Sequence, residues 1–142
     1  MKDSYTKKDQ NNKVEELHYE SKGWKSNLHF IQDEITFIDS LLNSYVFQPN
    51  TRNLFERFQD YLERLKKTKT SKKQLEKRIV KYENNLGGMM ECIDESCDLQ
   101  YYQKHNTLKA EVVDFIERFK ELKSEIFNYA GSILKKRKTG QN

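Results

Sequence analysis

The sequence is poor in the residues that form turns, because only one proline and five glycines occur among its 142 residues. Hairpins and sheet edges depend on such residues, so their scarcity argues against a β-sheet protein. Long apolar runs are also missing, and none approaches the roughly 18 to 20 residues that cross a bilayer. The first twelve residues are polar and lack the apolar stretch of a signal peptide. We therefore expect a cytoplasmic protein without a membrane span.

Cysteine and histidine are scarce as well, which limits the chemistry that the chain can support. Cys92 and Cys97 are spaced more widely than a Cys-x-x-Cys redox or zinc motif, and no second pair follows. In a cytoplasm we expect two reduced thiols, although the pair could form a disulfide in an oxidising compartment. The three histidines, His18, His29 and His105, do not form a close-spaced metal-binding set. We expect no metal, no other cofactor, no catalytic residue and no enzymatic activity.

What the chain does contain is three stretches with apolar residues at alternating steps of four and three. A helix turns once every 3.6 residues, so this spacing keeps the apolar side chains on one face. The pattern predicts helices over about residues 12–47, 51–86 and 92–136. Short links force neighbouring helices to run antiparallel. The predicted fold is all-α, an elongated antiparallel three-helix bundle, up-down-up, with coiled-coil-like packing over residues 12–136.

Breaks in the pattern set the expected boundaries of the bundle. Residues 1–11 are polar and without a stripe, so we expect a disordered or frayed N-terminus, and residues 137–142 should form a polar tail. Pro49 should end the first helix, and Gly87-Gly88 should end the second as a glycine C-cap. Residues 66–71 are a weak point of the second helix, but the apolar register passes through them unchanged. We therefore favour one continuous helix there.

Polar residues interrupt the stripes at Ser21, Lys72 and His105. If both links are tight, these residues lie near one layer of the bundle, beside Trp24. One interpretation is a polar pocket for a small ligand or a metal. The other is a layer that only fixes the register of the helices, with Lys72 reaching outward and His105 bonded locally. Both interpretations stay open.

Positive charge is concentrated in two places. Residues 64–81 hold nine basic residues against Glu76 alone, and a basic group ends the third helix. Acidic residues on neighbouring helices, or the helix dipole, account for part of this charge. The surplus could bind nucleic acid or another anionic surface. The candidates for such a basic patch are Lys66, Lys67, Lys69, Lys73, Lys135, Lys136, Arg137 and Lys138.

Packing residues outnumber any candidate for chemistry, so the leading hypothesis is a protein–protein interaction or scaffold module. Several apolar residues lie beside the main stripes, and any that the bundle does not bury would form a docking surface for another protein or for a second copy. The strong preference for Lys over Arg indicates an A+T-rich, bacterial genome. The residues beside the stripes are Phe30, Phe37, Leu41, Phe55, Leu62, Ile116 and Phe127.

Overall fold

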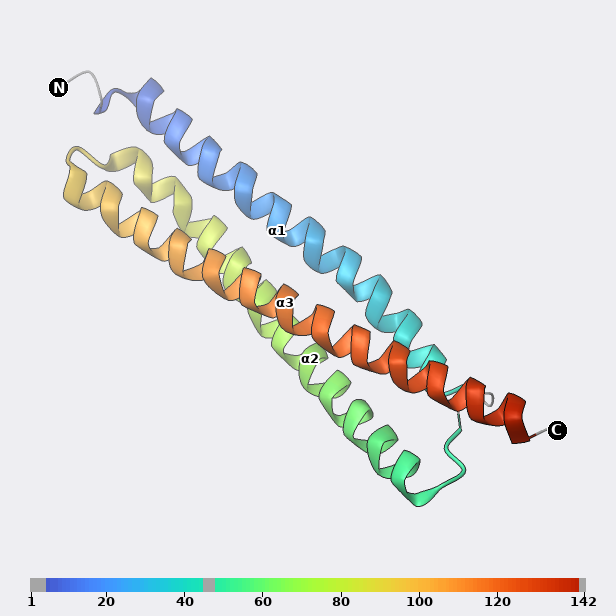
Figure 1. Cartoon of the computed structure of the whole chain (residues 1–142). Helices are drawn as coiled ribbons and strands as arrows, with labels where there is room; N and C mark the ends of the chain where they lie inside the picture. Colours follow the sequence, from blue (N-terminus) through green and yellow to red (C-terminus); the bar gives the residue numbers. More distant parts are fainter. Residues whose placement is uncertain (1–4, 45–47, 141–142) are drawn as a thin grey trace. The chain divides into compact units, whose positions relative to one another are not determined.

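A computed structural model describes residues 5–44 and 48–140, with the backbone alone for residues 136–140. It contains three α-helices, α1 (Lys7–Leu42), α2 (Arg52–Asn85) and α3 (Glu95–Gly140), and a 3₁₀ helix, η3 (Leu86–Glu91) (Figure 1). The described residues include no strand. The predicted all-helical fold of three helices packed as a bundle is therefore confirmed.

The ends of the helices differ from the prediction. Helix α1 begins at Lys7 because Thr6 caps it: the backbone N–H of Asp9 donates to the Thr6 hydroxyl at 3.1 Å, and that hydroxyl donates to the Asp9 carboxylate at 2.8 Å. The predicted disorder is thus wrong for residues 7–11, while residues 1–4 lie outside the described part. Helix α1 ends at Leu42 rather than at 47, and residues 45–47 are not described. Helix α3 continues to Gly140, so the predicted tail is wrong for residues 137–140.

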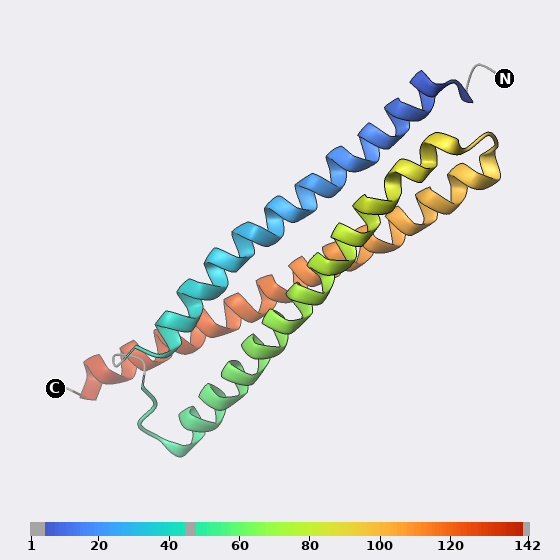
Figure 2. The ribbon, with the colours of Figure 1, turned by 180° about the vertical axis from the view of Figure 1, so that it is seen from behind.

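Helix α2 confirms one expectation and corrects another. It runs without a break through residues 66–71, as predicted. Its end is not the predicted glycine C-cap, since no described glycine has a positive φ, and the chain tightens instead into η3. A Cβ atom at Gly88 would collide with the hydroxyl of Tyr101, so a larger residue there would require the end of that side chain to move. Figure 2 shows this turn between α2 and α3, coloured yellow, from behind.

The contacts divide the chain into two compact units, and all three helices contribute to both. Unit 1 comprises Met1–His29 and Lys73–Asp114, and unit 2 comprises Phe30–Lys72 and Phe115–Asn142.

In unit 1, the cross-helix contacts show the up-down-up order. Ser21 of α1 bonds to Glu83 of α2, and Arg78 bonds to Glu111 of α3. A tight link after α1 would have set Ser21 opposite Glu76, two helical turns earlier in α2. The difference arises because α1 ends at Leu42, which leaves a longer link than expected. The buried apolar core consists of Leu17, Trp24, Leu28, Leu75, Ile79, Tyr82, Leu86, Met89, Cys92, Leu108 and Val112.

In unit 2, the same order is marked by ion pairs at the edges of the core. Lys123 of α3 pairs with Glu34 of α1 at 2.5 Å, and Arg64 of α2 binds both carboxylate oxygens of Glu125, at 2.9 and 2.8 Å. The core is apolar and rich in β-branched and aromatic residues: Ile31, Ile35, Ile38, Leu42, Leu54, Phe58, Tyr61, Leu65, Phe115, Phe119, Leu122, Ile126, Tyr129, Ala130 and Ile133.

Candidate functional site

The most polar layer of a core lies in unit 1, around His105. The His105 ring lies 4.8 Å from the Trp24 ring and 5.5 Å from the Tyr82 ring, measured between centroids. All three side chains are buried. Three helices therefore each contribute one ring to the same layer, which is how an imidazole can be accommodated in an otherwise apolar stripe.

Both nitrogens of His105 have partners. Nδ1 lies 2.6 Å from the Tyr82 hydroxyl, and Nε2 is bonded to the Glu20 carboxylate, which Lys109 also approaches at 3.3 Å. The neutral Nε2–H tautomer satisfies both contacts, since it donates to Glu20 and accepts from Tyr82. The hydrogen bond from His105 lowers the pKa of Glu20, whereas burial, reinforced by the charge of Glu20, raises the pKa of Tyr82. The result is a chain of hydrogen bonds from a protonated tyrosine through histidine to a carboxylate.

A second carboxylate, that of Glu83, lies next to this layer. The Ser21 hydroxyl donates to it at 2.6 Å, Lys25 approaches at 2.7 Å and His18 at 3.4 Å. Burial alone would raise the pKa of Glu83, but the hydrogen bonds from Lys25 and Ser21 outweigh it and the pKa is lowered. Ser21 of α1 is thus hydrogen-bonded to a carboxylate of α2 that Lys25 also approaches.

Three of the four residues predicted for a polar layer are brought together: Ser21, Trp24 and His105 all belong to unit 1. Lys72 is buried but belongs to unit 2, and the residue of α2 that contacts His105 is Tyr82, ten residues later in the chain. Among the described residues, no group of three or more His, Cys, Asp and Glu residues could hold a metal ion. Sequence reasoning missed Glu20, because an acid beside the apolar stripe resembles an ordinary surface residue.

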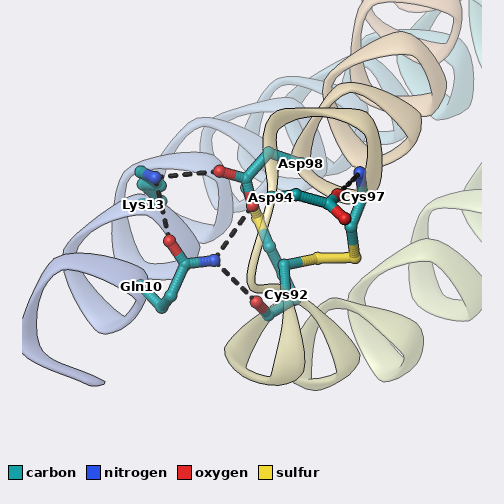
Figure 3. The surroundings of a disulfide bond; sticks show 7 residues. Gln10, Lys13, Cys92, Asp94, Cys97 and Asp98 are labelled. Carbon is teal, nitrogen blue, oxygen red and sulfur yellow. Dashed lines mark hydrogen bonds and ion pairs between the residues drawn. A yellow bond between two sulfur atoms is a disulfide. The ribbon is translucent and has the colours of Figure 1, made fainter. Parts of the chain in front are cut away.

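Cys92 and Cys97 form a disulfide, which contradicts the expectation of two reduced thiols (Figure 3). The bond closes the turn between η3 and the first turn of α3. Asp94 reinforces the same turn, because its carboxylate accepts a hydrogen bond from the backbone N–H of Cys97 at 2.9 Å. The turn is therefore held both by a covalent bond and by a helix cap.

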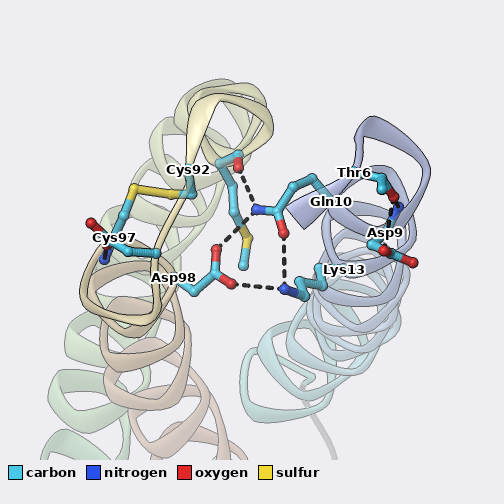
Figure 4. A network of polar contacts seen from close by, with 9 residues as sticks. Thr6, Asp9, Gln10, Lys13, Cys92, Cys97 and Asp98 are labelled. Carbon is cyan, nitrogen blue, oxygen red and sulfur yellow. Dashed lines mark hydrogen bonds and ion pairs between the residues drawn. A yellow bond between two sulfur atoms is a disulfide. The ribbon is translucent and has the colours of Figure 1, made fainter. Parts of the chain in front are cut away.

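The N-terminal end of α1 is attached to this turn by a buried network (Figure 4). The fully buried amide of Gln10 donates to the carbonyl of Met89 at 2.8 Å and to Asp98 at 2.9 Å. The ammonium of Lys13 donates to the Gln10 amide oxygen and to Asp98, both at 2.8 Å. The hydrogen bond to Asp98 raises the pKa of Lys13. Gln10 fell within the predicted disordered end, so nothing in the stripe pattern indicated this network.

An open groove of about 950 Å³ lies between α2 and α3 in unit 1. Its walls carry cations, amides and a tyrosine, and none of the residues that line it is acidic. They are Arg78, Lys81, Tyr82, Asn84, Asn85, Gly88, Gln100, Tyr101, Gln103, Lys104, Thr107 and Leu108.

The basic residues that the sequence singles out differ in exposure and in pairing. In unit 2, Lys66 and Lys67 are exposed, while Lys69 lies 3.6 Å from Asp39. In unit 1, Lys73 is exposed. Lys135 is exposed near the end of α3, and the side chains of Lys136, Arg137 and Lys138 lie outside the described residues.

Some apolar side chains beside the stripes stay outside the core of unit 2. Phe30 is 65% exposed, Phe37 60% and Phe127 43%. Phe37 and Phe127 line a cavity of about 220 Å³ between α1 and α3, together with the Glu34–Lys123 ion pair. Isolated exposed apolar residues are common, but aromatic side chains gathered beside a cavity indicate a contact surface.

Comparisons of the chain with protein-family models, with curated proteins and with solved structures find no match. None of the described helices combines the length and apolar character needed to cross a membrane. The function of the chain is therefore inferred below from the contacts, burial and charges of the described residues.

Proposed function

We propose that this chain is a non-enzymatic interaction module that docks a helix of a partner protein on the α1–α3 face of unit 2. The observation that carries the proposal is the exposure of Phe30, Phe37 and Phe127 on that face. Transfer of one phenylalanine from water to an apolar contact is worth about 1.5–3 kcal/mol. Three such residues would supply a large part of the free energy of a specific complex.

The spacing of these residues suits a helical ligand. Phe30 and Phe37 are seven residues apart on α1, and Phe127 and Leu134, also exposed, are seven apart on α3. Helices α1 and α3 run in the same direction here, because Glu34 pairs with Lys123 while Phe37 and Phe127 share a cavity. A helix laid between two such rows inserts side chains at the same seven-residue spacing, as in a four-helix bundle.

The test compares two triple variants, each of which removes three exposed, largely apolar side chains. The face variant carries Phe30→Ser, Phe37→Ser and Phe127→Ser, and the control carries Tyr19→Ser, Phe55→Ser and Ile93→Ser, which are exposed elsewhere. In quantitative pull-downs from the native host, the partner should be retained by the wild type and the control and lost by the face variant. Light scattering of the purified proteins distinguishes a second copy from a different protein. Equal retention by both variants would contradict the proposal.

A second candidate function is binding to nucleic acid or another anionic surface. Its support is that Lys66, Lys67 and Lys73 are exposed and have no ion-pair partner among the described residues. It is the weaker candidate, because Arg64, Lys69 and Arg78 form ion pairs within the chain. It predicts binding to DNA that falls steeply with salt and weakens on charge reversal at the three exposed lysines. Salt-independent behaviour on a heparin column would exclude it.

The sequence and the disulfide favour different cellular compartments for this protein. The sequence predicts the cytoplasm, whereas the Cys92–Cys97 disulfide favours an oxidising environment. Titration of free thiols in protein taken directly from the host distinguishes the two, because a cytoplasmic protein should give two thiols and an exported one none.

A further inference from the structure

The groove between α2 and α3 of unit 1 has the electrostatics of an anion site. Lys81 on the α2 wall and Lys104 on the α3 wall line it from opposite sides, and both are exposed. Neither has an ion-pair partner among the residues that the structure describes. Like charges that line one groove repel each other, and an anion bound in the groove is attracted to both.

Arg78 adds a third positive group at the same groove. Its guanidinium already donates to Glu111 at 2.9 Å, and Glu111 does not line the groove. This ion pair holds Arg78 in position, and the remaining N–H groups of its guanidinium can still donate to a ligand. The walls thus carry three cations, of which two have no partner and one is held in place.

The remaining walls offer neutral hydrogen-bonding groups. Asn84 and Asn85 on α2 and Gln100 and Gln103 on α3 line the groove, and none has a side-chain hydrogen bond within the described part of the chain. Each amide provides two hydrogen-bond donors and an acceptor, so together they can bind the polar groups of a small molecule.

Gly88, Leu108 and two tyrosines, Tyr82 and Tyr101, also line the groove. Gly88 lies against the hydroxyl of Tyr101, where any side chain would collide. Buried Leu108 and Tyr82 form part of the floor, and Tyr82 is fixed from behind by its hydrogen bond to His105. A ring of the ligand can therefore lie against Tyr101 while its polar groups meet the amides.

We propose that this groove binds a phosphorylated small molecule of nucleotide size, with its phosphate between Lys81 and Lys104. The volume of about 950 Å³ is sufficient for such a ligand. The site is distinct from the docking face of unit 2 and does not depend on it. The cations select the phosphate, and the amides and Tyr101 hold the body of the molecule.

The test uses AMP, inorganic pyrophosphate and adenosine as probes, with binding followed by NMR titration at low salt. AMP should shift the signals of Gly88, Tyr101 and Thr107, and pyrophosphate should compete with it. The double variant Lys81→Gln, Lys104→Gln should weaken the binding of AMP by about tenfold or more. Adenosine, which has no phosphate, should bind about tenfold or more weakly than AMP.

A matched control separates this site from general attraction to a basic protein. Lys73→Gln, Lys77→Gln removes two exposed charges from the same helix but outside the groove, and should leave the binding of AMP within about twofold. Circular dichroism confirms the fold of both variants. The proposal is overturned if neither phosphate probe binds, if the control loses as much affinity as the groove variant, or if adenosine binds as tightly as AMP.

Discussion

The same three helices build two cores of different character. In unit 1 the core contains Gln10, Ser21, Asp98 and His105, each buried and hydrogen-bonded across helices, and a disulfide closes its turn. In unit 2 Lys72 is buried, the other core side chains are apolar or aromatic, and the ion pairs Arg64–Glu125 and Lys69–Asp39 lie at the edges. Polar groups in a core fix register because any shift leaves them without partners, whereas apolar stripes tolerate more variation. The buried polar contacts of unit 1 therefore define its helix register more closely than the largely apolar core of unit 2 does.

Truncation of apolar core residues should lower the free energy of unfolding most, and by a similar amount in the two units. Ile79 in unit 1 and Ile126 in unit 2 are both fully buried. Truncation of either to alanine should lower the free energy of unfolding by about 2–5 kcal/mol. Urea denaturation measures both, and costs that differ by more than about 2 kcal/mol would show that one core is packed more loosely than described.

Loss of the disulfide should affect unit 1 alone. Replacing Cys92 and Cys97 by serine removes a short covalent loop and should cost about 2 kcal/mol. Hydrogen exchange should accelerate over η3 and the first turn of α3, while the exchange of unit 2 helices stays unchanged. Unaltered exchange around Met89 would mean that the Asp94 cap and the Gln10 network hold the turn by themselves.

Two tyrosines give the sharpest matched contrast between the units. The Tyr82 hydroxyl is hydrogen-bonded to Nδ1 of His105, so Tyr82→Phe leaves a buried nitrogen without a partner and should cost about 1–2 kcal/mol. The hydroxyl of Tyr129 is buried without a hydrogen bond among the described residues. Tyr129→Phe should therefore be neutral or stabilising by up to about 1 kcal/mol. Thermal unfolding measures the stability of both variants. Equal destabilisation by Tyr82→Phe and Tyr129→Phe would contradict the difference expected between the two hydroxyls.

The smallest effects are electrostatic and depend on pH. The pKa values of Glu83 and Glu125 are lowered in the folded protein. Each ionised carboxylate therefore stabilises the fold at pH values above its usual pKa of 4.5. That contribution is lost as the pH falls below 4.5 through the lowered folded value. Glu83→Gln should cost about 1 kcal/mol at pH 7, since the side chain is only 10% exposed. Glu125 is 46% exposed, so Glu125→Gln should cost no more than about 0.5 kcal/mol.

Urea denaturation between pH 3 and 7 measures this last contrast. The wild type should lose stability below pH 4.5, and Glu83→Gln should reduce that loss more than Glu125→Gln does. The reverse order would show that the Arg64–Glu125 pair contributes more than its exposure allows.

The sequence predicted the helices well because stripes with a 3.6-residue period are strong, local signals. It also predicted that α2 passes through residues 66–71, since the register was preserved there. It failed where the outcome depends on long-range geometry. The chain runs on through η3 beyond Gly87-Gly88 before α3 begins at Glu95, so Tyr82 rather than Lys72 lies against His105. Gln10 lay in a polar segment without periodicity, so its burial could not be foreseen.

The candidate surfaces were only partly predictable for the same reason. Phe30, Phe37 and Phe127 were recognised as lying beside the stripes, but whether a three-helix bundle buries such residues depends on its actual packing. The groove between α2 and α3 was not indicated at all, because Lys81, Lys104 and the amides are unremarkable surface residues in sequence. Only the alignment of two helices brings them to one groove.

The most direct test of the docking face is photo-crosslinking in the native host. A photoreactive phenylalanine analogue is placed at position 37 and, as a control, at position 55, which is also exposed and lies on α2 of the same unit. The account predicts one discrete crosslinked product from position 37 and none from position 55. Absence of a product at position 37, or equal labelling from both positions, would contradict it.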